Sequence, residues 1–214
     1  LIIIINVLVY FYSFGKPPGF YDVFIMKYGV IPFEITTGID IPPLINYPVY
    51  ITLITSLFIH GGFSHIFGNM LFLWIFGDNV EDVLGKIKYL LIYFAGGIGA
   101  SLCQVAISPS SKIPLVGASG AISAVMGAYI VLLPLSFINL IVPFLFFPLI
   151  VQVPAFVFIF FCFLSQLFNA ALGIPGVGWW AHIGGFLTGL ILAILLRGGK
   201  KKSRDYDVFY PDRW

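Results

Sequence analysis

The chain has 214 residues, of which 60% are hydrophobic and only 9% charged, and its formal net charge at pH 7 is +2. Soluble domains carry about 25% charged residues, so this composition excludes an ordinary soluble domain and indicates a one-domain membrane protein with several spans. The small net charge gives no reason to expect a nucleic-acid partner. Cys103 and Cys162 lie in apolar runs without the spacing of a metal site, so we expect no disulfide, metal or cofactor.

Six membrane spans are predicted, because a helix needs about 20 apolar residues to cross the hydrocarbon layer. Their approximate ranges are 1–14, 49–76, 89–107, 116–133, 153–172 and 179–196. We expect the acidic cluster after residue 76 to end the second span in water. The first range is short and begins at Leu1 inside an apolar run, so we expect the start of the sequence to be trimmed or incomplete.

The segment between the first two spans, residues 15–48, contains six prolines that break any long helix. Its many Phe, Tyr and Ile side chains make it a poor candidate for a fully solvated loop. We expect a long first external loop that lies partly in the membrane interface, where aromatic rings are favoured. The alternative is a small folded domain outside the membrane.

Residues 135–152 are apolar enough for a span but carry Pro143 and Pro148 in their middle. We interpret them as an interfacial connection, because a seventh span would put the basic tail and the loop after the second span on opposite sides. With six spans, that side of the membrane carries eight of the eleven basic residues: Lys86, Lys88, Arg197, Lys200, Lys201, Lys202, Arg204 and Arg213.

The positive-inside rule makes this side cytoplasmic. We therefore predict a membrane domain over residues 1–196 and a basic cytoplasmic tail over 197–214, with both termini in the cytoplasm of a prokaryotic cell. The loops before Val116 and before Trp179 then face outward.

Two reactive side chains share one depth under this topology. Ser119 lies about five residues past Pro114 and His182 about six past Gly176, which at 1.5 Å rise per residue places both roughly 10 Å below the outer surface. Polar groups at such depth are costly and are often functional. Imidazole can accept the proton of a serine nucleophile near neutral pH. The alternative is that the serine packs quietly between helices and the histidine is structural.

Donors for an oxyanion are also available near this depth. His65 and Asn69 are four residues apart and lie on one helix face, and the Ser119 backbone N–H lies at a helix start. Equally, the two side chains could form only interhelical hydrogen bonds. Small residues at Gly120, Gly127, Gly185 and Gly189 would let the fourth and sixth spans pack closely.

A carboxylate partner for the histidine is hard to find. Six of the nine acidic residues fall on the cytoplasmic side, and the three on the outer side all lie in the first loop: Asp22, Glu34 and Asp40. The sequence therefore predicts a Ser–His dyad rather than a triad.

Four motifs, in this order and at these ends of the spans, make the sequence resemble the rhomboid family of intramembrane serine proteases over residues 41–196. They are His60-Gly-Gly-Phe-Ser-His65 with Asn69, Gly77-x-x-x-Glu81-x-x-x-Gly85, Gly117-Ala118-Ser119-Gly120 with Gly127, and Ala181-His182-x-x-Gly185-x-x-x-Gly189.

The resemblance implies an all-α bundle of six transmembrane helices with a half-embedded first loop. It implies Ser119 as nucleophile and His182 as general base. Oxyanion or substrate-binding roles fall to His65, Asn69, Gly117 and the Ser119 amide. Substrates would be single-span membrane proteins, cut within or near the outer end of their transmembrane segment.

One position departs from the family pattern. Some members carry an aromatic residue one turn after the nucleophile that stacks on the catalytic imidazole, whereas this chain has Ser123.

Two other functions compete with the protease. A catalytically silent rhomboid-like binder of membrane helices would be expected to lack Ser119 or His182. A small transporter would be expected to show charged residues or broken helices near the bilayer centre and repeated halves. The sequence says nothing of the oligomeric state.

Overall fold

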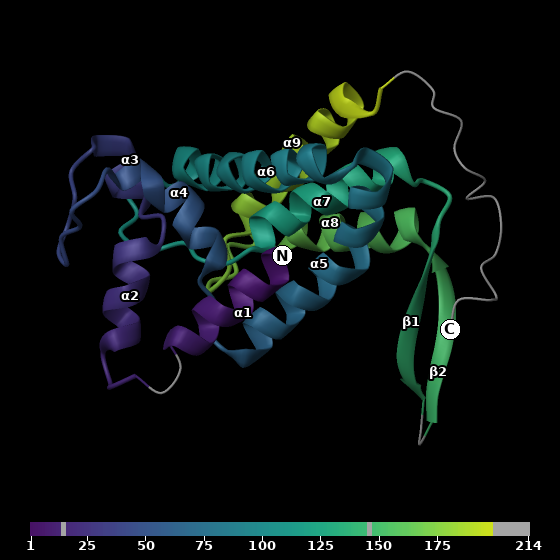
Figure 1. Ribbon diagram of the computed structural model, residues 1–214, viewed down its shortest axis with the longest axis horizontal. Coiled ribbons are helices and arrows are strands. Elements are labelled where there is room, and N and C mark those ends of the chain that lie inside the picture. The colour runs from purple at the N-terminus through teal and green to yellow at the C-terminus, as the bar shows by residue number, and fades with distance from the viewer. Residues whose placement is uncertain (14–15, 145–146, 199–214) are drawn as a thin grey trace.

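The computed structural model describes residues 1–13, 16–144 and 147–198 and is mostly helical (Figure 1). The α-helices are α1 (Ile2–Ser13), α2 (Phe20–Tyr28), α3 (Pro32–Thr37), α4 (Thr52–Thr55), α5 (Phe63–Leu84), α6 (Lys86–Ile107), α7 (Ser119–Leu132), α8 (Ala155–Ala171) and α9 (Trp179–Leu196). Two 3₁₀ turns, η1 (Val49–Ile51) and η2 (Ser56–Phe58), flank α4, and one sheet contains β1 (Phe137–Phe144) and β2 (Phe147–Pro154).

Helix α7 is the centre of the bundle. It packs against α5, α6, α8 and α9, and every residue from Gly120 to Tyr129 is buried. The segment consists largely of Gly, Ala and Ser together with a few larger apolar residues, so neighbouring helices can approach its backbone closely.

Glycines bring α9 onto α7 as the sequence predicts. A Cβ added at Gly185 would overlap the carbonyl oxygen of Gly120, and one added at Gly189 would overlap that of Ala124. A Cβ at Gly127 would in turn meet the backbone of α9. Backbone therefore packs against backbone along this pair, and the predicted close contact of the two helices is confirmed.

Helix α6 packs against a neighbouring face of α7 by the same means. A Cβ at Gly96 would overlap Ala124, and one at Gly120 would lie 2.6 Å from the Ala100 Cβ. Small residues in α6 therefore permit close packing as well, and α6, α7 and α9 come together at the first half of α7.

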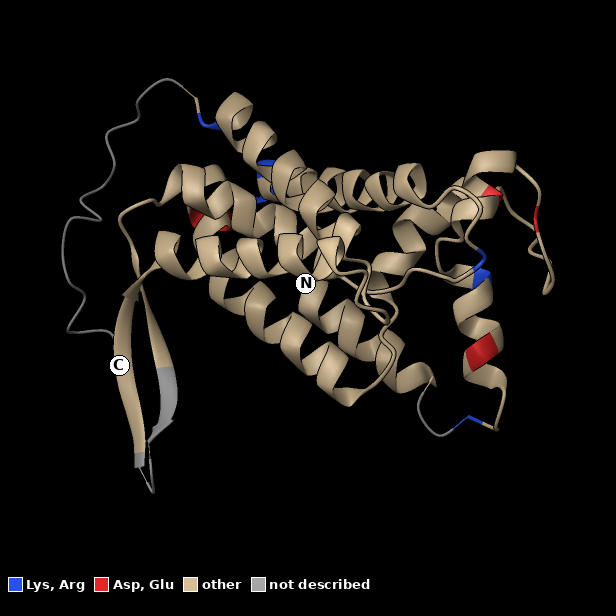
Figure 2. Cartoon of the chain, turned by 180° about the vertical axis from the view of Figure 1, so that it is seen from behind, with Lys and Arg blue, Asp and Glu red and all other residues tan. Residues whose placement is uncertain are grey.

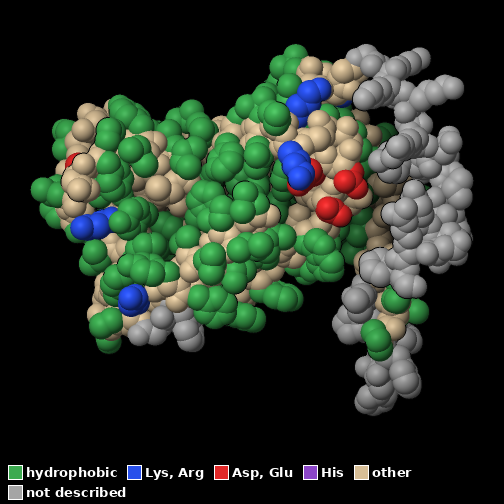
Figure 3. Space-filling model, in the orientation of Figure 1, with side chains coloured by type: hydrophobic (Ala, Val, Ile, Leu, Met, Phe, Trp, Pro, Cys, Tyr) green, Lys and Arg blue, Asp and Glu red, His purple; other side chains and the backbone are tan. Residues whose placement is uncertain are grey.

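The described residues include two helices that are long and apolar enough to cross a membrane, α6 and α9. The segments Val49–Phe58 and Phe63–Leu84 pass the same test together but are bent by 84° at the break between them. The other three apolar helices, α1, α7 and α8, are shorter. Hydrophobic side chains cover the middle of the bundle, and charged groups gather toward its ends (Figures 2 and 3).

Helix α5 continues beyond the predicted end of the second span. Asp78 and Asp82 are exposed on its last turns, and the helix stops only at Gly85, which has a φ of 79°. Acidic side chains at the end of a helix can reach water without ending it, whereas this left-handed conformation does end it and favours glycine. At its other end, α5 begins at Phe63, directly after the break that follows Phe58.

The segment at 135–152 corrects the expectation of an all-α chain. It forms an antiparallel hairpin in which Asn139 pairs with Gln152 and Pro143 with Pro148. Many of its residues are β-branched or aromatic, which favours strands, and the two prolines exclude a continuous helix. The hairpin projects from the end of the bundle where α7 ends and α8 begins (Figure 1). The segment is therefore a hairpin and not a seventh helix, and its interfacial position stays a prediction.

The first loop is folded against the bundle rather than extended. Val30 pairs with Leu115 in an isolated bridge, and the Phe33 N–H donates to the Ser111 carbonyl. Glu34 is buried at 2% exposure and accepts a hydrogen bond of 3.0 Å from the Ile41 N–H. Burial raises the pKa of this carboxyl above its ordinary value. Embedding of the loop in the interface remains a prediction.

The basic tail lies mostly beyond the described residues. Of its predicted basic side chains, only Arg197 is described, at the end of α9. Lys200, Lys201, Lys202, Arg204 and Arg213 lie outside the described ranges, as does Phe14 at the end of the predicted first span.

Candidate functional site

Ser119 is the first residue of α7, and a strained turn places it there. Gly117 has a φ of 121°, a conformation that favours glycine, and its N–H donates to the Ser56 carbonyl at 2.9 Å. The first backbone N–H groups of a helix have no acceptor within the helix. The turn therefore presents the Ser119 hydroxyl beside backbone donors.

His182 reaches the same point from the first turn of α9. Its Nε2 lies 2.8 Å from Ser119 Oγ, and its backbone N–H donates to the Gly178 carbonyl. The close packing of α7 and α9 permits this contact between residues 63 positions apart. With the hydroxyl as donor and Nε2 as acceptor, the imidazole is in the protonation state of a general base. The two residues that the sequence paired are brought together.

His65 also faces this point, from the first turn of α5. Its Nδ1 accepts a hydrogen bond of 3.2 Å from the Gly61 N–H, so a neutral ring carries its proton on Nε2. A Cβ at Gly117 would lie 2.8 Å from that Nε2 and 3.7 Å from Ser119 Oγ. The His65 Nε2–H is therefore a donor directed toward the Ser119 turn, and Gly117 leaves room for it.

Asn69 lies beside the same cavity, and its amide is already partly engaged within its own helix. It is 8% exposed, and its Nδ2 donates to the His65 carbonyl at 3.0 Å, within its own helix. One of its two amide protons is therefore used to hold α5 together. The interhelical hydrogen bonds that the alternative interpretation proposed for His65 and Asn69 are not among those that the described residues form.

Two further residues belong to the site, although the sequence analysis gave neither a role. His60 is 1% exposed, its Nε2 lies 3.5 Å from the Ala118 N–H, and its ring lies 5.0 Å from that of His65. Trp179 lies against His182, with ring centroids 5.9 Å apart. His60 could have been found from its place in the motif that contains His65, and Trp179 from its spacing of three residues before His182.

A cavity of about 990 Å³ joins these groups. It is lined by the predicted site residues together with α6 and the loops before α7 and α9. Ser101 and Gln104 add polar groups from α6, so the cavity has a partly hydrophilic wall. Within the described ranges, no group of three or more His, Cys, Asp or Glu could hold a metal ion, and no hydrogen bond joins His182 to a carboxylate.

Comparison with known proteins points to one family. Residues 48–199 match the family model of the rhomboid domain. The chain is 34% identical over 145 residues to RHOMBOID-like protein 6, mitochondrial, of Arabidopsis thaliana, which covers 67% of this chain and 43% of that protein. It is 30% identical over 171 residues to Rhomboid protein 1, mitochondrial, of Saccharomyces cerevisiae, covering 77% and 47%.

A shorter match is to a protein named as a protease. The chain is 42% identical over 76 residues to Rhomboid protease GluP of Bacillus subtilis, covering 36% of this chain and 14% of that protein. This chain thus spans less than half the length of each of these relatives. The family match nevertheless covers most of the chain, which is an integral membrane protein belonging to the rhomboid family.

Proposed function

We propose that this chain is an intramembrane serine endopeptidase that uses Ser119 and His182 as a dyad. The observation that carries the proposal is the distance of 2.8 Å between Ser119 Oγ and His182 Nε2, at the wall of a large cavity. A serine needs a base within hydrogen-bond distance to become a nucleophile, and this geometry supplies one. The rhomboid family and its protease-named members support the reaction class.

The reaction follows from these positions. Ser119 Oγ attacks the carbonyl carbon of the scissile peptide while His182 Nε2 takes the hydroxyl proton. The resulting oxyanion is stabilised by the His65 Nε2–H and the Ser119 backbone N–H, with Asn69 close by. The C–N bond then breaks as His182 returns the proton to the leaving amine. Water, deprotonated by His182, hydrolyses the acyl-enzyme and releases Ser119.

Six spans fit this site if α7 begins inside the membrane. At 1.5 Å per residue the 14 residues of α7 cover about 21 Å, less than the hydrocarbon thickness of about 30 Å. Non-helical backbone is tolerated at membrane depth where it lines a cavity, and residues 113–117 do so. The spans would be α1, α5, α6, α7, α8 and α9, with Ser119 below the outer surface.

The orientation rests on basic residues at the end of the bundle opposite the cavity. Lys88 Nζ donates to the Leu196 carbonyl at the end of α9, and Lys86 and Arg197 lie at the same end. The positive-inside rule makes that end cytoplasmic. The relatives come from a bacterium and from the mitochondria of yeast and a plant, so they do not favour a prokaryotic cell membrane over an organelle membrane.

Single-span membrane proteins are the proposed substrates. Large side chains such as Phe160 and Phe161 are exposed on α8, as on a helix that faces lipid. Near the cytoplasmic end α8 is held to α5 through the ring of Phe158, which packs against Phe72 and Phe76. We propose that the outer half of α8 and the 173–178 loop move to admit a substrate helix from the lipid.

The test is cleavage of a single-span reporter by the purified protein in liposomes, with the cut site mapped by mass spectrometry. We expect a cut within or near the outer end of the reporter's transmembrane segment. We expect cleavage to be faster when that end carries a helix-breaking Gly or Pro. A cut confined to the opposite, cytoplasmic end would contradict the proposed topology. Tight binding of the reporter without any cut would favour the silent helix-binding alternative.

A further inference from the structure

The imidazole of His182 has one aromatic neighbour among the described residues. The Trp179 and His182 ring centroids are 5.9 Å apart and their planes make an angle of 87°. Trp179 is the first residue of α9 and lies one turn before His182 on the same helix. This edge-to-face geometry is a favourable arrangement of two aromatic rings. One turn after Ser119 on α7, Ser123 is buried and contributes no ring.

The indole is itself held in place. Trp179 Nε1–H donates to the Ile174 carbonyl at 2.8 Å, and the Trp179 backbone N–H donates to the Val177 carbonyl. Both acceptors belong to the 173–178 loop, part of which lines the cavity together with Trp179 and His182. The indole therefore has a fixed orientation, set by the loop on one side and by α9 on the other.

A fixed neighbour matters because the imidazole can rotate about its own side-chain bonds. Terminal torsions of histidine are broad, and a moderate rotation would move Nε2 away from Ser119 Oγ. Within the described ranges, no carboxylate hydrogen bond orients the His182 ring. The contact with Trp179 disfavours one direction of rotation, while the bond of 2.8 Å to Ser119 defines the productive orientation.

We infer that Trp179 is a positioning residue for the proposed dyad: its indole, fixed by the 173–178 loop, holds the His182 imidazole in the orientation that directs Nε2 at Ser119. The inference rests on the proposed function for its kinetic consequences. Its structural content, a rigid imidazole that depends on the indole, stands independently of activity.

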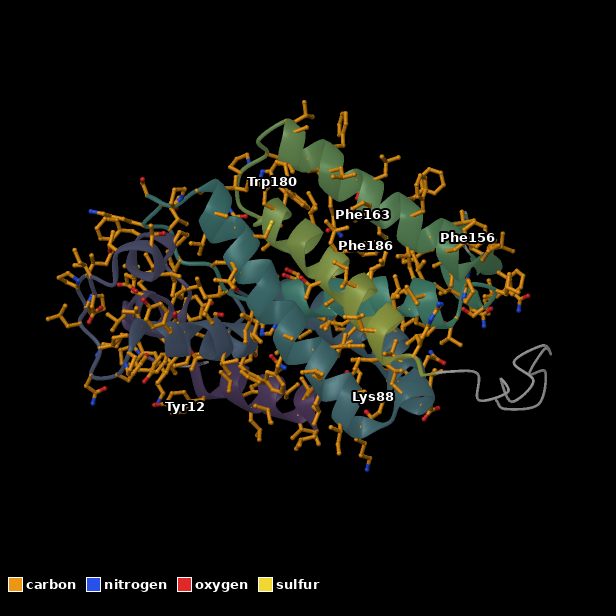
Figure 4. The ribbon with its side chains drawn as sticks, turned by 90° about the horizontal axis from the view of Figure 1, so that it is seen from above. Tyr12, Lys88, Phe156, Phe163, Trp180 and Phe186 are labelled. Carbon is orange, nitrogen blue, oxygen red and sulfur yellow. The ribbon has the colours of Figure 1, made fainter. Side chains whose placement is uncertain are left out.

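Three variants distinguish the effect of the Trp179 ring from that of its hydrogen bond and of the neighbouring residue. Trp179→Leu removes the ring, and Trp179→Phe keeps an aromatic ring without the Nε1–H donor. Trp180→Leu is the matched control, because Trp180, labelled in Figure 4, is the next residue of α9 and is not among the residues that line the cavity. Thermal unfolding in detergent shows whether each variant is folded.

For reporter cleavage we expect Trp179→Leu to lower kcat at least tenfold with KM within twofold of the parent. We expect Trp179→Phe to have a kcat at least fivefold higher than that of Trp179→Leu, and Trp180→Leu to have a kcat within twofold of the parent. The pH profile of kcat should change in Trp179→Leu alone. An unchanged kcat in Trp179→Leu would overturn the inference. So would a loss in Trp179→Phe as large as in Trp179→Leu.

A second readout does not depend on cleavage. The chain has only three histidines, so histidine-labelled protein gives a simple imidazole NMR spectrum in which His182→Ala assigns the His182 signal. We expect the ring-current shift of that signal to be lost, and the signal to broaden, in Trp179→Leu but not in Trp180→Leu. An unaltered His182 signal in Trp179→Leu would refute the positioning role even if the protein cuts nothing.

Discussion

Gly185 in α9 lies against the carbonyl oxygen of Gly120 in α7, so closely that a single added Cβ would overlap that oxygen. Gly120 follows the proposed nucleophile directly, and Gly185 lies three residues after the proposed base. The contact therefore sets the spacing of the two helices at the point where their reactive side chains meet.

Replacing Gly185 by Val should separate α7 from α9. Inserting bulk into a packed core costs about 1–3 kcal/mol or more, and at this site the obstacle is backbone, which cannot rotate aside. We expect a lower unfolding temperature in detergent together with a loss of activity. The control is Gly68→Val, because a Cβ at Gly68 has no atom within 4 Å. Equal stability of the two variants would count against the contact.

His65 and Asn69 should differ in their effect on catalysis. The free His65 Nε2–H is directed toward the Ser119 turn, whereas the Asn69 amide already donates to the His65 carbonyl. Loss of one oxyanion donor typically costs 10²–10³ in kcat. We expect His65→Ala to approach that range and Asn69→Ala to lose less, with KM little changed in both. A larger loss of kcat in Asn69→Ala would reverse the assignment of the main side-chain donor.

How much of this site could be predicted depends on which interactions are local in sequence. Ser119 and His182 could be paired because both follow turn residues by similar numbers, which fixes their depth. The packing glycines could be found because small residues repeat along α6, α7 and α9. The spacing of Trp179 from His182 places the two residues one turn apart, but the orientation of the indole could not be predicted, because the 173–178 loop determines it.

The hairpin shows a different limit. A short apolar run can form a buried strand or a helix, and its periodicity does not separate the two. Pro143 and Pro148 correctly excluded a continuous helix, but only their pairing across β1 and β2 identifies the fold. The length of α5 could not be read from the predicted end of the second span, because the exposed Asp78 and Asp82 let the helix continue at no cost for its charges.

Locking α8 to α5 at their outer halves should block substrate entry. A reversible cysteine crosslink between these halves, made after replacing Cys103 and Cys162, is expected to reduce reporter cleavage, and reduction of the crosslink should restore it. A crosslink between α6 and α9, which pack directly against each other, provides the control and should leave cleavage unchanged. Unaltered turnover with the α5–α8 crosslink closed would exclude this route.

Glu34 should make the stability of the first loop depend on pH. Its folded-state pKa is raised because burial disfavours the charged carboxylate. A raised pKa means that the folded state binds the proton more tightly. The resulting stabilisation is fully present below the ordinary value of 4.5 and is lost as the pH rises through the higher folded value.

Glu34→Gln removes this titration and can still accept the hydrogen bond from the Ile41 N–H. We expect the variant to unfold at a higher temperature than the parent at pH 7, with a smaller difference at pH 4. Thermal unfolding across this pH range measures the effect. A variant that is less stable than the parent at pH 7 would show that the ionised carboxylate is instead favourable.

The central claim is the Ser119–His182 dyad, and cleavage of the single-span reporter by the parent, Ser119→Ala and His182→Ala in liposomes tests it most directly. The account predicts cleavage by the parent and a loss of at least 10³-fold in both variants while they remain folded. A fluorophosphonate should label Ser119 in the parent. Retained cleavage in either folded variant, or a parent that neither cleaves the reporter nor is labelled at Ser119, would contradict the account.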